Sequence, residues 1–349
     1  MNVTFVIISF QLLVFLFFIK MKDFVYYPIY VTTLNRYEHF RRLVESLQRN
    51  TDVDKTEFII GLDYPPSVEY KSGYEKIRKY IPSITGFKKV TVFPTNINLG
   101  QYANGMRLRD YIKNQGFDGY IGTEDDNEFS PNFIQYMNWC LNYFRDDQSI
   151  YAICSCMNID VSGIKNNIYK LNHAFSGWGI GMWFSRYNKL EKYRDLSYQK
   201  KILDSISVYC IFSNRIYFVD RILGMLRGGW PYGDTLPMFL PFNERWCIFP
   251  KLNKVRNWGG DGSGQHGGTA EVFEKYSTLP IDEDEVFVPQ ISGDIYSSIM
   301  QDRLNEAYKH SWRDYFRAVV LFIIYKVTGK ILVIKKTKGW PKIKLQKAL

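Results

Sequence analysis

Three consecutive acidic residues, Glu124-Asp125-Asp126, are the part of this chain whose type and spacing most clearly indicate chemistry. They directly follow an apolar stretch, 119–123, that has the pattern of a buried strand. Adjacent carboxylates repel one another, and burying them costs free energy unless a cation or hydrogen-bond donors neutralise them. Mg²⁺ and Mn²⁺ prefer such oxygens and commonly share their coordination with substrate phosphates. The alternative is a solvated acidic turn before the helix at Pro131, but the position at a strand end favours the metal site.

The segments before the acidic triplet alternate between strand-like and helix-like patterns, which predicts a parallel sheet covered by helices. We expect strands at 30–33, 57–62, 90–93 and 120–123, and helices at 38–48, 74–80 and 102–114. In such sheets ligands bind at the carboxyl ends of the strands. Thr32, Asp63 and the triplet fall at these ends and should meet at one edge. The predicted fold class is therefore α/β, with a mostly parallel sheet flanked by helices.

Composition and charge narrow the classes of function. The chain has 349 residues, of which 46% are hydrophobic and 23% charged, as in a folded protein rather than a disordered chain or a coiled coil. The formal charge of +10 arises in residues 309–349, with eleven Lys or Arg and one acid, while the rest carries 34 basic and 34 acidic residues. No nucleic-acid groove is therefore expected. Five Cys without a CxxC pair and four His argue against a zinc site or a disulfide framework and favour a reducing compartment.

The N-terminal segment 3–19 is an apolar run followed by Lys20 and Lys22. Its length is near the lower limit for a bilayer span. Lysines on its C-terminal side favour the cytoplasmic face for the domain that follows. The alternative is that Met21 is the true start, which would make the first twenty residues dispensable.

The C-terminal segment has a different pattern. Residues 318–325 and 331–334 are apolar, Lys and Gly interrupt them, and further lysines follow. Trp312 and Trp340 lie near the ends of this segment. The pattern favours an interfacial helix on an anionic leaflet, and the alternative is a core helix followed by a solvated basic tail.

The segment 124–133, with the letters EDDNEFSPNF, resembles the Glu-Asp-Asp…Pro-Asp-Phe segment of GT-A glycosyltransferases, most closely the N-acetylglucosaminyltransferase I type. The resemblance continues in chain order through the segments 32–36, 58–63, 102–107, 247–255 and 258–267. The ordered series is more specific than any single motif. It implies the GT-A fold and a metal-dependent, inverting transfer of a sugar from a nucleotide-diphosphate donor, by default a UDP-sugar, to a glycan or lipid-linked acceptor.

The resemblance also implies roles for individual residues. Asp63 faces the uracil, Asp125 lies near the ribose, and Asp126 is the direct ligand of Mn²⁺ or Mg²⁺, which acts as a Lewis acid on the leaving diphosphate. The expected donor-binding residues are Thr32, Asn35, Arg36, Asp63, Tyr102, Arg107, Glu124, Asp125 and Ser263. His266 is a second candidate for contact with the metal or a phosphate.

Asp234 is the expected catalytic base, because its spacing from Cys247 resembles that of the second Asp in the family's Trp-Asp-Asp-Trp segment. Loss of hydration in an aromatic-walled site would raise its basicity. The alternative is a cap on the segment that follows. Gly177, Trp178 and Trp230 are the expected sugar or acceptor contacts, since Gly lets backbone approach a ligand and Trp stacks on sugars. For the Gly-Trp segment, a tight turn packed under core Trp is equally open.

We expect four parts: a hydrophobic segment 1–20, a GT-A domain 24–270, an extension 271–308 and a basic membrane-associating tail 309–349. The stretch 189–226 has no counterpart in the family, and Lys254 replaces its Arg. The short link after the apolar run suggests a bacterial enzyme at the cytoplasmic face of the inner membrane. Its expected partners are a nucleotide-sugar donor, a glycan or polyprenyl-linked acceptor and an anionic membrane surface. Two alternatives are a nucleotidyltransferase, whose Gly-rich basic loop is missing here, and an inactive membrane-docked binding protein.

Overall fold

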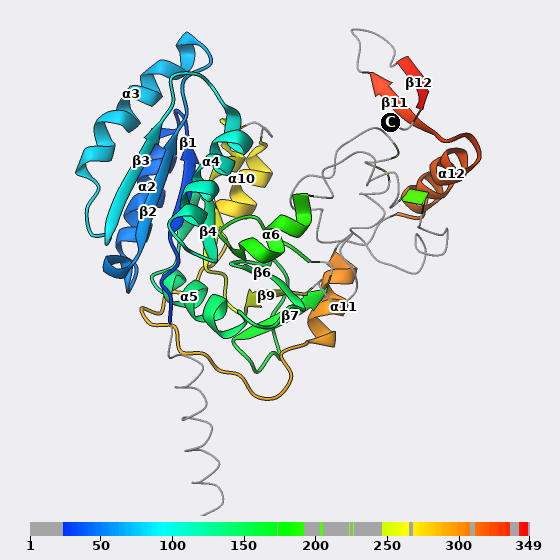
Figure 1. Ribbon diagram of the computed structural model, residues 1–349. Coiled ribbons are helices and arrows are strands. Elements are labelled where there is room, and N and C mark those ends of the chain that lie inside the picture. Colours follow the sequence, from blue (N-terminus) through cyan, green and yellow to red (C-terminus); the bar gives the residue numbers. More distant parts are fainter. Residues whose placement is uncertain are drawn as a thin grey trace, which may run out of the picture. The chain divides into compact units, whose positions relative to one another are not determined.

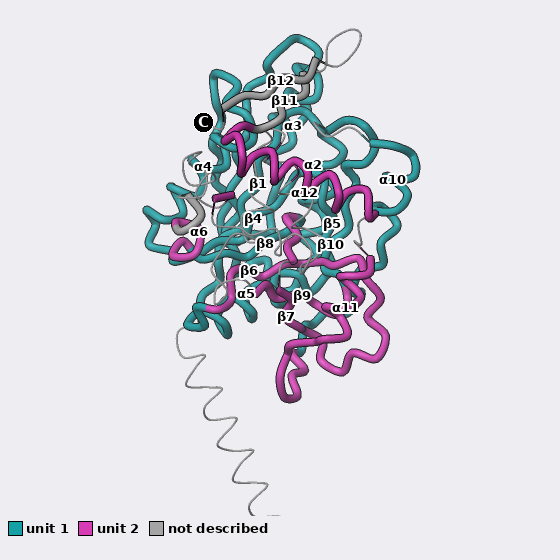
Figure 2. The backbone as a smooth tube through the Cα atoms, turned by 90° about the vertical axis from the view of Figure 1, so that its right-hand side faces the viewer, with its two compact units in different colours: residues 1–148, 178–183, 253–288 teal, residues 149–177, 184–252, 289–349 magenta. Residues whose placement is uncertain are grey.

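The computed structural model describes two compact units (Figures 1 and 2). Unit 1 comprises Met1–Gln148, Trp178–Trp183 and Asn253–Val288, and unit 2 comprises Ser149–Gly177, Phe184–Leu252 and Pro289–Leu349. Within them the structure describes residues 24–172, 174–191, 203–204, 223, 226, 246–264, 268–307, 311–335 and 342–347.

Unit 1 is built on a mostly parallel sheet flanked by helices, as predicted (Figure 1). Its strands, in the spatial order β3-β2-β1-β4-β8, are Lys89–Pro94, Glu57–Leu62, Ile29–Thr33, Gly119–Glu124 and Ile180–Trp183. The first four are parallel to one another, and β8 runs antiparallel to β4. The helices of this part are α2 (Tyr37–Gln48), α3 (Lys71–Tyr80), α4 (Gly100–Asn114) and α5 (Phe133–Tyr143). Every strand and helix expected before the acidic triplet is confirmed.

The helices form where their apolar residues recur with the helical period. In α2 the buried side chains are Phe40, Leu43, Val44, Ser46 and Leu47. Helix α4 packs against β1, β2 and β4. Its close approach requires Gly61, because a Cβ there would lie 2.7 Å from Asn104 Oδ1. The same amide donates to the Gly61 carbonyl at 3.0 Å.

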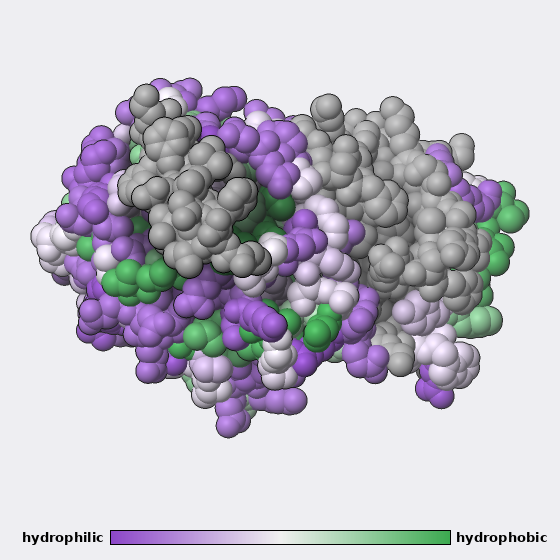
Figure 3. Space-filling model, turned by 90° about the horizontal axis from the view of Figure 1, so that it is seen from below, coloured by the Kyte–Doolittle hydropathy of each residue, from purple (hydrophilic) through white to green (hydrophobic). Residues whose placement is uncertain are grey.

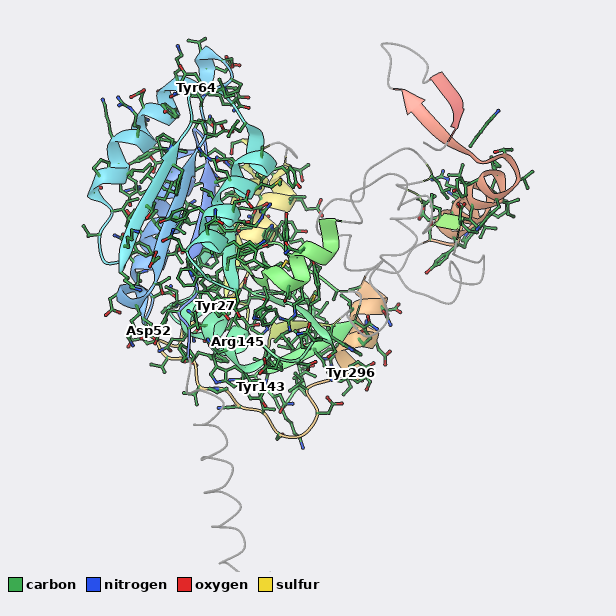
Figure 4. The ribbon with its side chains drawn as sticks, viewed as in Figure 1. Tyr27, Asp52, Tyr64, Tyr143, Arg145 and Tyr296 are labelled. Atoms are coloured by element: carbon green, nitrogen blue, oxygen red, sulfur yellow. The ribbon has the colours of Figure 1, made fainter. Side chains whose placement is uncertain are left out.

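Side chains of α5 and the turn after it bind the chain that enters β1. The amides of Val25 and Tyr27 donate to Asn142 Oδ1 and Asn138 Oδ1 at 2.9 and 2.7 Å. Arg145 Nε donates to the Tyr27 hydroxyl at 3.2 Å, and the two side chains lie close together in Figure 4. These contacts hold the segment before β1 against α5 and the turn after it.

A two-stranded antiparallel sheet returns the later part of unit 1 to the acidic triplet. It pairs β5 (Asn127–Phe129) with β10 (Val255–Asn257) and is followed by α10 (Ala270–Ser277). Lys254, next to β10, is 2% exposed and is ion-paired with Asp282. It also donates to Asn132 Oδ1 at 2.8 Å. Burial lowers the pKa of this lysine.

In unit 2 the strand order is β6-β9-β7, with β6 parallel and β7 antiparallel to β9. These strands are Ile150–Cys154, Trp246–Pro250 and Ile168–Asn172. The helices whose bounds lie within the described part of unit 2 are α6 (Phe184–Glu191), α11 (Ser298–Ala307) and α12 (Trp312–Thr328), and the C-terminal segment forms β11 (Lys330–Lys335) and β12 (Lys342–Lys347).

The C-terminal segment corrects one expectation. Residues 318–325 are helical within α12, but residues 331–334 lie in β11, which pairs antiparallel with β12. A helix over the whole apolar segment is therefore wrong. The physical reason is Gly329, whose φ of 64° ends α12, followed by a run rich in β-branched residues that favours a strand.

No helix in the described part of the chain is both long and apolar enough to cross a bilayer. The N-terminal run 3–19 lies outside that part, so the predicted anchor there stays a prediction.

Candidate functional site

The site begins where β1 and β4 end side by side. Thr32 pairs with Glu124 in the parallel register, so the chain leaving β1 runs next to the chain leaving β4. Asp125 and Asp126 form the turn after β4 and are only 6% and 8% exposed. The predicted convergence of the strand ends is confirmed by this pairing. Asn35 and Arg36 follow β1 directly and lead into α2.

Arg36 neutralises both buried aspartates. Its guanidinium is ion-paired with Asp125 and donates to Asp126 Oδ2 at 2.8 Å. Burial alone would lower the pKa of Arg36, but the two carboxylates more than offset this effect and raise it. The guanidinium therefore stays charged and acts as the resident counter-ion of the acidic turn.

The remaining carboxylate oxygens also have partners within the protein. Thr33 Oγ1 donates to Asp125 Oδ2 at 3.0 Å, and Asn257 Nδ2 donates to Asp126 Oδ1 at 2.8 Å. Burial raises the pKa of Asp125, although the Arg36 charge acts in the opposite direction. All four oxygens of the two aspartates accept a hydrogen bond in this arrangement.

Glu124, the first acid of the triplet, differs from the two aspartates in its hydrogen bonding and in its pKa. Within the described part of the chain, its side chain accepts one hydrogen bond, from Gln101 Nε2 to Oε1 at 3.4 Å. Burial and the charges of Asp126 and Asp125 raise its pKa from 4.5 to about 7. Glu124 therefore gains and loses a proton near neutral pH, as a functional carboxyl group commonly does.

We tested whether these groups fit the expected Mn²⁺ or Mg²⁺. Among the described residues, no group of three or more His, Cys, Asp or Glu side chains is placed to hold a metal ion. Asp126, the expected ligand, is engaged by Arg36 and Asn257. His266, the second candidate, lies outside the described part of the chain. As placed, the two aspartates fit a guanidinium and do not fit a divalent cation.

Asp63, expected to face a base, accepts hydrogen bonds from the loop that follows β3. The amides of Leu99 and Gly100 donate to its two oxygens at 2.9 and 2.8 Å. Further donors are the Tyr64 amide at 2.9 Å, Thr95 Oγ1 at 3.1 Å and Asn98 Nδ2 at 3.3 Å. The carboxylate is 5% exposed and fixes the start of α4. Its contact with a nucleotide stays a prediction.

The other expected donor-binding residues lie on α4 and in the segment after β10. Arg107 donates from NH2 to the Phe93 carbonyl at 2.7 Å and to Asn104 Oδ1 at 2.8 Å, so it holds α4 to the end of β3. Burial lowers its pKa. Tyr102, on α4, is 48% exposed. Ser263 donates from its backbone N–H and its hydroxyl to Asp261 Oδ1, at 2.9 and 2.7 Å.

The expected acceptor-side residues are mostly not described. Asp234 and Trp230 lie outside the described residues, so nothing in the structure bears on their roles. Trp178 belongs to unit 1, where its ring meets Tyr276 edge-on with centroids 4.8 Å apart. Gly177 is an exposed residue of unit 2.

The segment after β10 contributes contacts that the sequence analysis missed. The Trp258 amide donates to the Asp126 carbonyl at 2.8 Å. A Cβ on Gly259 would lie 2.2 Å from Asp126 Oδ2, so only glycine fits there without a shift. His39 Nε2, on α2, lies 3.3 Å from Asp261 Oδ2. The only available signal was the run Trp258-Gly259-Gly260, which gives no hint that it returns to Asp126.

Trp258 is itself held in place by charged groups of unit 1. Its indole N–H donates to Glu128 Oε2 at 2.8 Å, and the Arg42 guanidinium lies 3.9 Å from its ring centroid. Arg256 pairs with Glu128 at 2.8 Å. These contacts fix the segment 258–261 against the acidic turn.

No protein-family model and no curated protein matches the chain. Among solved structures, it is similar to the mannosyltransferase PcManGT from Pyrobaculum calidifontis in complex with GDP-Man and Mn²⁺, with 12% identity, 47% of this chain and 46% of that chain covered, and a TM-score of 0.33. It is also similar to S. aureus TarS, with 14% identity, 49% of this chain and 30% of that chain covered, and a TM-score of 0.30. The match to apo mouse xyloside xylosyltransferase 1 has 8% identity, covers 52% of this chain and 75% of that chain, and has a TM-score of 0.33. The chain spans less than half the length of the first two. At these identities and TM-scores, the similarity carries no conclusion about function.

Proposed function

We propose that the protein is a glycosyltransferase that moves a sugar from a nucleotide-diphosphate donor, preferably a UDP-sugar, to a glycan or lipid-linked acceptor. The observation that carries the proposal is the placement of Arg36, Asp125 and Asp126 together at the carboxyl ends of β1 and β4. Ligands bind at this edge of parallel sheets, and a planar guanidinium matches the geometry of a phosphate. The resemblance of the segment 124–133 to GT-A enzymes supports the same assignment.

In this proposal the groups divide into three roles. Thr32, Asn35, Arg36 and Ser263 lie on the donor side, with Asp125 near the ribose. Asp63 holds the loop before α4, and Arg107 holds the middle of α4 to β3; this loop and helix would cover the base. Asp234 takes the proton of the acceptor hydroxyl, and a direct displacement of this kind inverts the anomeric centre. Gly177, Trp178 and Trp230 are the proposed acceptor contacts, and the catalytic domain is 24–270.

Binding of the proposed cofactor, Mn²⁺ or Mg²⁺, would require the Arg36 guanidinium to release Asp125 and Asp126. Because each oxygen of Asp125 and Asp126 already accepts a hydrogen bond from an internal donor, we derive no step through a metal. The chain's own cation is the group that stands beside the acidic turn. A guanidinium carries five N–H donors, two of which contact the aspartates, so it also suits the charge of a leaving diphosphate.

A screen of nucleotide sugars for hydrolysis or transfer, with and without Mn²⁺, tests the proposal. Arg36→Lys should lower turnover at least tenfold, because a lysine cannot bind two carboxylates and a phosphate as a fork. Arg41→Lys is the matched control, since Arg41 lies on α2, the helix that Arg36 precedes, with its side chain 46% exposed. If the wild type neither binds nor cleaves any nucleotide sugar, the proposal is wrong.

The internal hydrogen bonds of the two aspartates favour one other candidate, a sugar- or nucleotide-binding protein without catalysis. Such a protein would show a ligand-dependent rise in melting temperature in the same screen but no cleavage. Cleavage by the wild type separates the two cases, and its loss in Asp234→Asn would support the role of this residue as the base.

A further inference from the structure

Helix α12 has two apolar faces, of which only one is covered. The buried face consists of Ala318, Phe322 and Tyr325, with exposures of 0%, 1% and 2%. The Tyr325 hydroxyl donates to Asp204 Oδ1 at 2.7 Å, which anchors this face within unit 2.

The opposite face is a stripe of large exposed side chains. It consists of Trp312 (72% exposed), Phe316 (62%), Val320 (37%), Ile323 (48%) and Val327 (79%). At about 100° per residue the five positions fall within roughly 80° of the helix circumference, and the buried positions lie on the other side. Hydrophobic side chains are visible at the right-hand edge of Figure 3, on the side where α12 lies in Figure 1.

A stripe of this kind is unusual on a protein surface that meets only water. Exposed apolar side chains normally occur singly, and contiguous apolar patches mark sites of interaction. The charges around the stripe indicate which kind of partner it contacts.

The charges select an anionic partner. Arg313 and Arg317 are exposed and lie on the border of the stripe, next to Trp312 and Phe316. Residues 309–349 carry eleven basic residues and one acid, whereas the rest of the chain is neutral. Apolar side chains that alternate with cations, with a tryptophan at the end of the helix, are typical of helices in the interface of a bilayer. Seventeen residues with charges at this spacing do not span one.

We propose that α12 docks in the plane of an anionic lipid bilayer. Trp312, Phe316, Val320, Ile323 and Val327 enter the boundary between headgroups and acyl chains, and Arg313 and Arg317 contact lipid phosphates. The basic strands β11 and β12 add a diffuse attraction to the surface. The proposal does not depend on the sugar-transfer activity, because it rests only on α12 and the charge of the segment that contains it.

Vesicle sedimentation of the full chain tests this. We expect at least tenfold stronger binding to vesicles of 30% phosphatidylglycerol in phosphatidylcholine than to pure phosphatidylcholine, and weaker binding as salt rises. The double variant Phe316→Ser/Ile323→Ser should lose at least tenfold in binding to the anionic vesicles, since it removes two exposed apolar side chains that would enter the bilayer. Val68→Ser/Ile97→Ser is the matched control, because these side chains are 76% and 66% exposed elsewhere and should not matter.

Two further measurements keep the result decisive. Circular dichroism of the double variant should match the wild type, since neither residue is buried, and nucleotide-sugar cleavage in vesicle-free buffer should not change. The N-terminal run 3–19 would bind neutral and anionic bilayers alike, so the readout is the difference between the two. Binding by the double variant equal to wild type, or a wild type without preference for anionic lipid, overturns the proposal. A dimer that dissociates in the double variant would also overturn it, in favour of a second copy of the chain.

Discussion

Replacement of Arg36 by methionine removes the resident counter-ion of the acidic turn and keeps a side chain of similar length. The guanidinium is 18% exposed, and the Asp125 and Asp126 side chains are 8% and 10% exposed, so the pair belongs to the buried class. Breaking a buried pair by removing one partner costs about 3–5 kcal/mol. Because Thr33 and Asn257 still donate to the two aspartates, we expect a loss of about 3 kcal/mol, the lower end of this range, at pH 8.

The loss should depend on pH. Arg36 lowers the pKa of Asp125, so its removal raises that pKa further. The stability that Arg36 contributes is present only while the carboxylate is ionised, and it is lost as the pH falls through the pKa in the folded state. Urea unfolding of Arg36→Met and wild type at pH 8 and pH 5 should therefore show a smaller difference at pH 5.

The same variant tests the metal prediction. With Arg36 gone, one oxygen of each aspartate loses its donor, and Mn²⁺ should raise the unfolding midpoint of Arg36→Met but not of the wild type. Arg41→Met, whose partners Glu38 and Glu45 are exposed, should change stability by less than about 1 kcal/mol. If Arg36→Met is as stable as wild type at pH 8, or its loss is equal at both pH values, the counter-ion argument is refuted.

Three further substitutions probe the site. Because the pKa of Glu124 is raised from 4.5 to about 7, ionisation lowers wild-type stability as the pH rises between these values, and Glu124→Gln should add roughly 2–3 kcal/mol at pH 8. No difference in urea midpoint between pH 4.5 and pH 8 would contradict this. Asp63→Ala leaves the partly buried amides at 99 and 100 without their acceptor and should cost about 2 kcal/mol in urea unfolding; loss of nucleotide binding without loss of stability would refute the structural role. Gly259→Ala places a Cβ against Asp126 and should lower stability by about 1–3 kcal/mol, whereas Gly177→Ala, with its nearest neighbour atom at 3.9 Å, should have no effect on the melting temperature.

The elements of unit 1 that carry the site could be predicted from the sequence because their signals are local. The strand at 57–62 and the helix that ends at Gln48 follow from the spacing of apolar residues, which repeats within a few positions. Thr32 and Glu124 meet at one edge because parallel strands have their carboxyl ends on the same side of the sheet, where ligands bind. The acidic triplet was recognisable as the candidate site for the same reason.

The partners of these acids were decided by the tertiary structure. Asn257 meets Asp126 only because β10 pairs with β5 across more than a hundred residues, and no periodic signal encodes that pairing. Arg36 satisfies the aspartates, and Asp63 accepts from backbone amides, because burial in a folded chain demands a partner for every charge and donor. The sequence determined which residues reach the edge of the sheet. Only the fold determined that a guanidinium neutralises them there, since the nearest cation depends on the path of the whole chain.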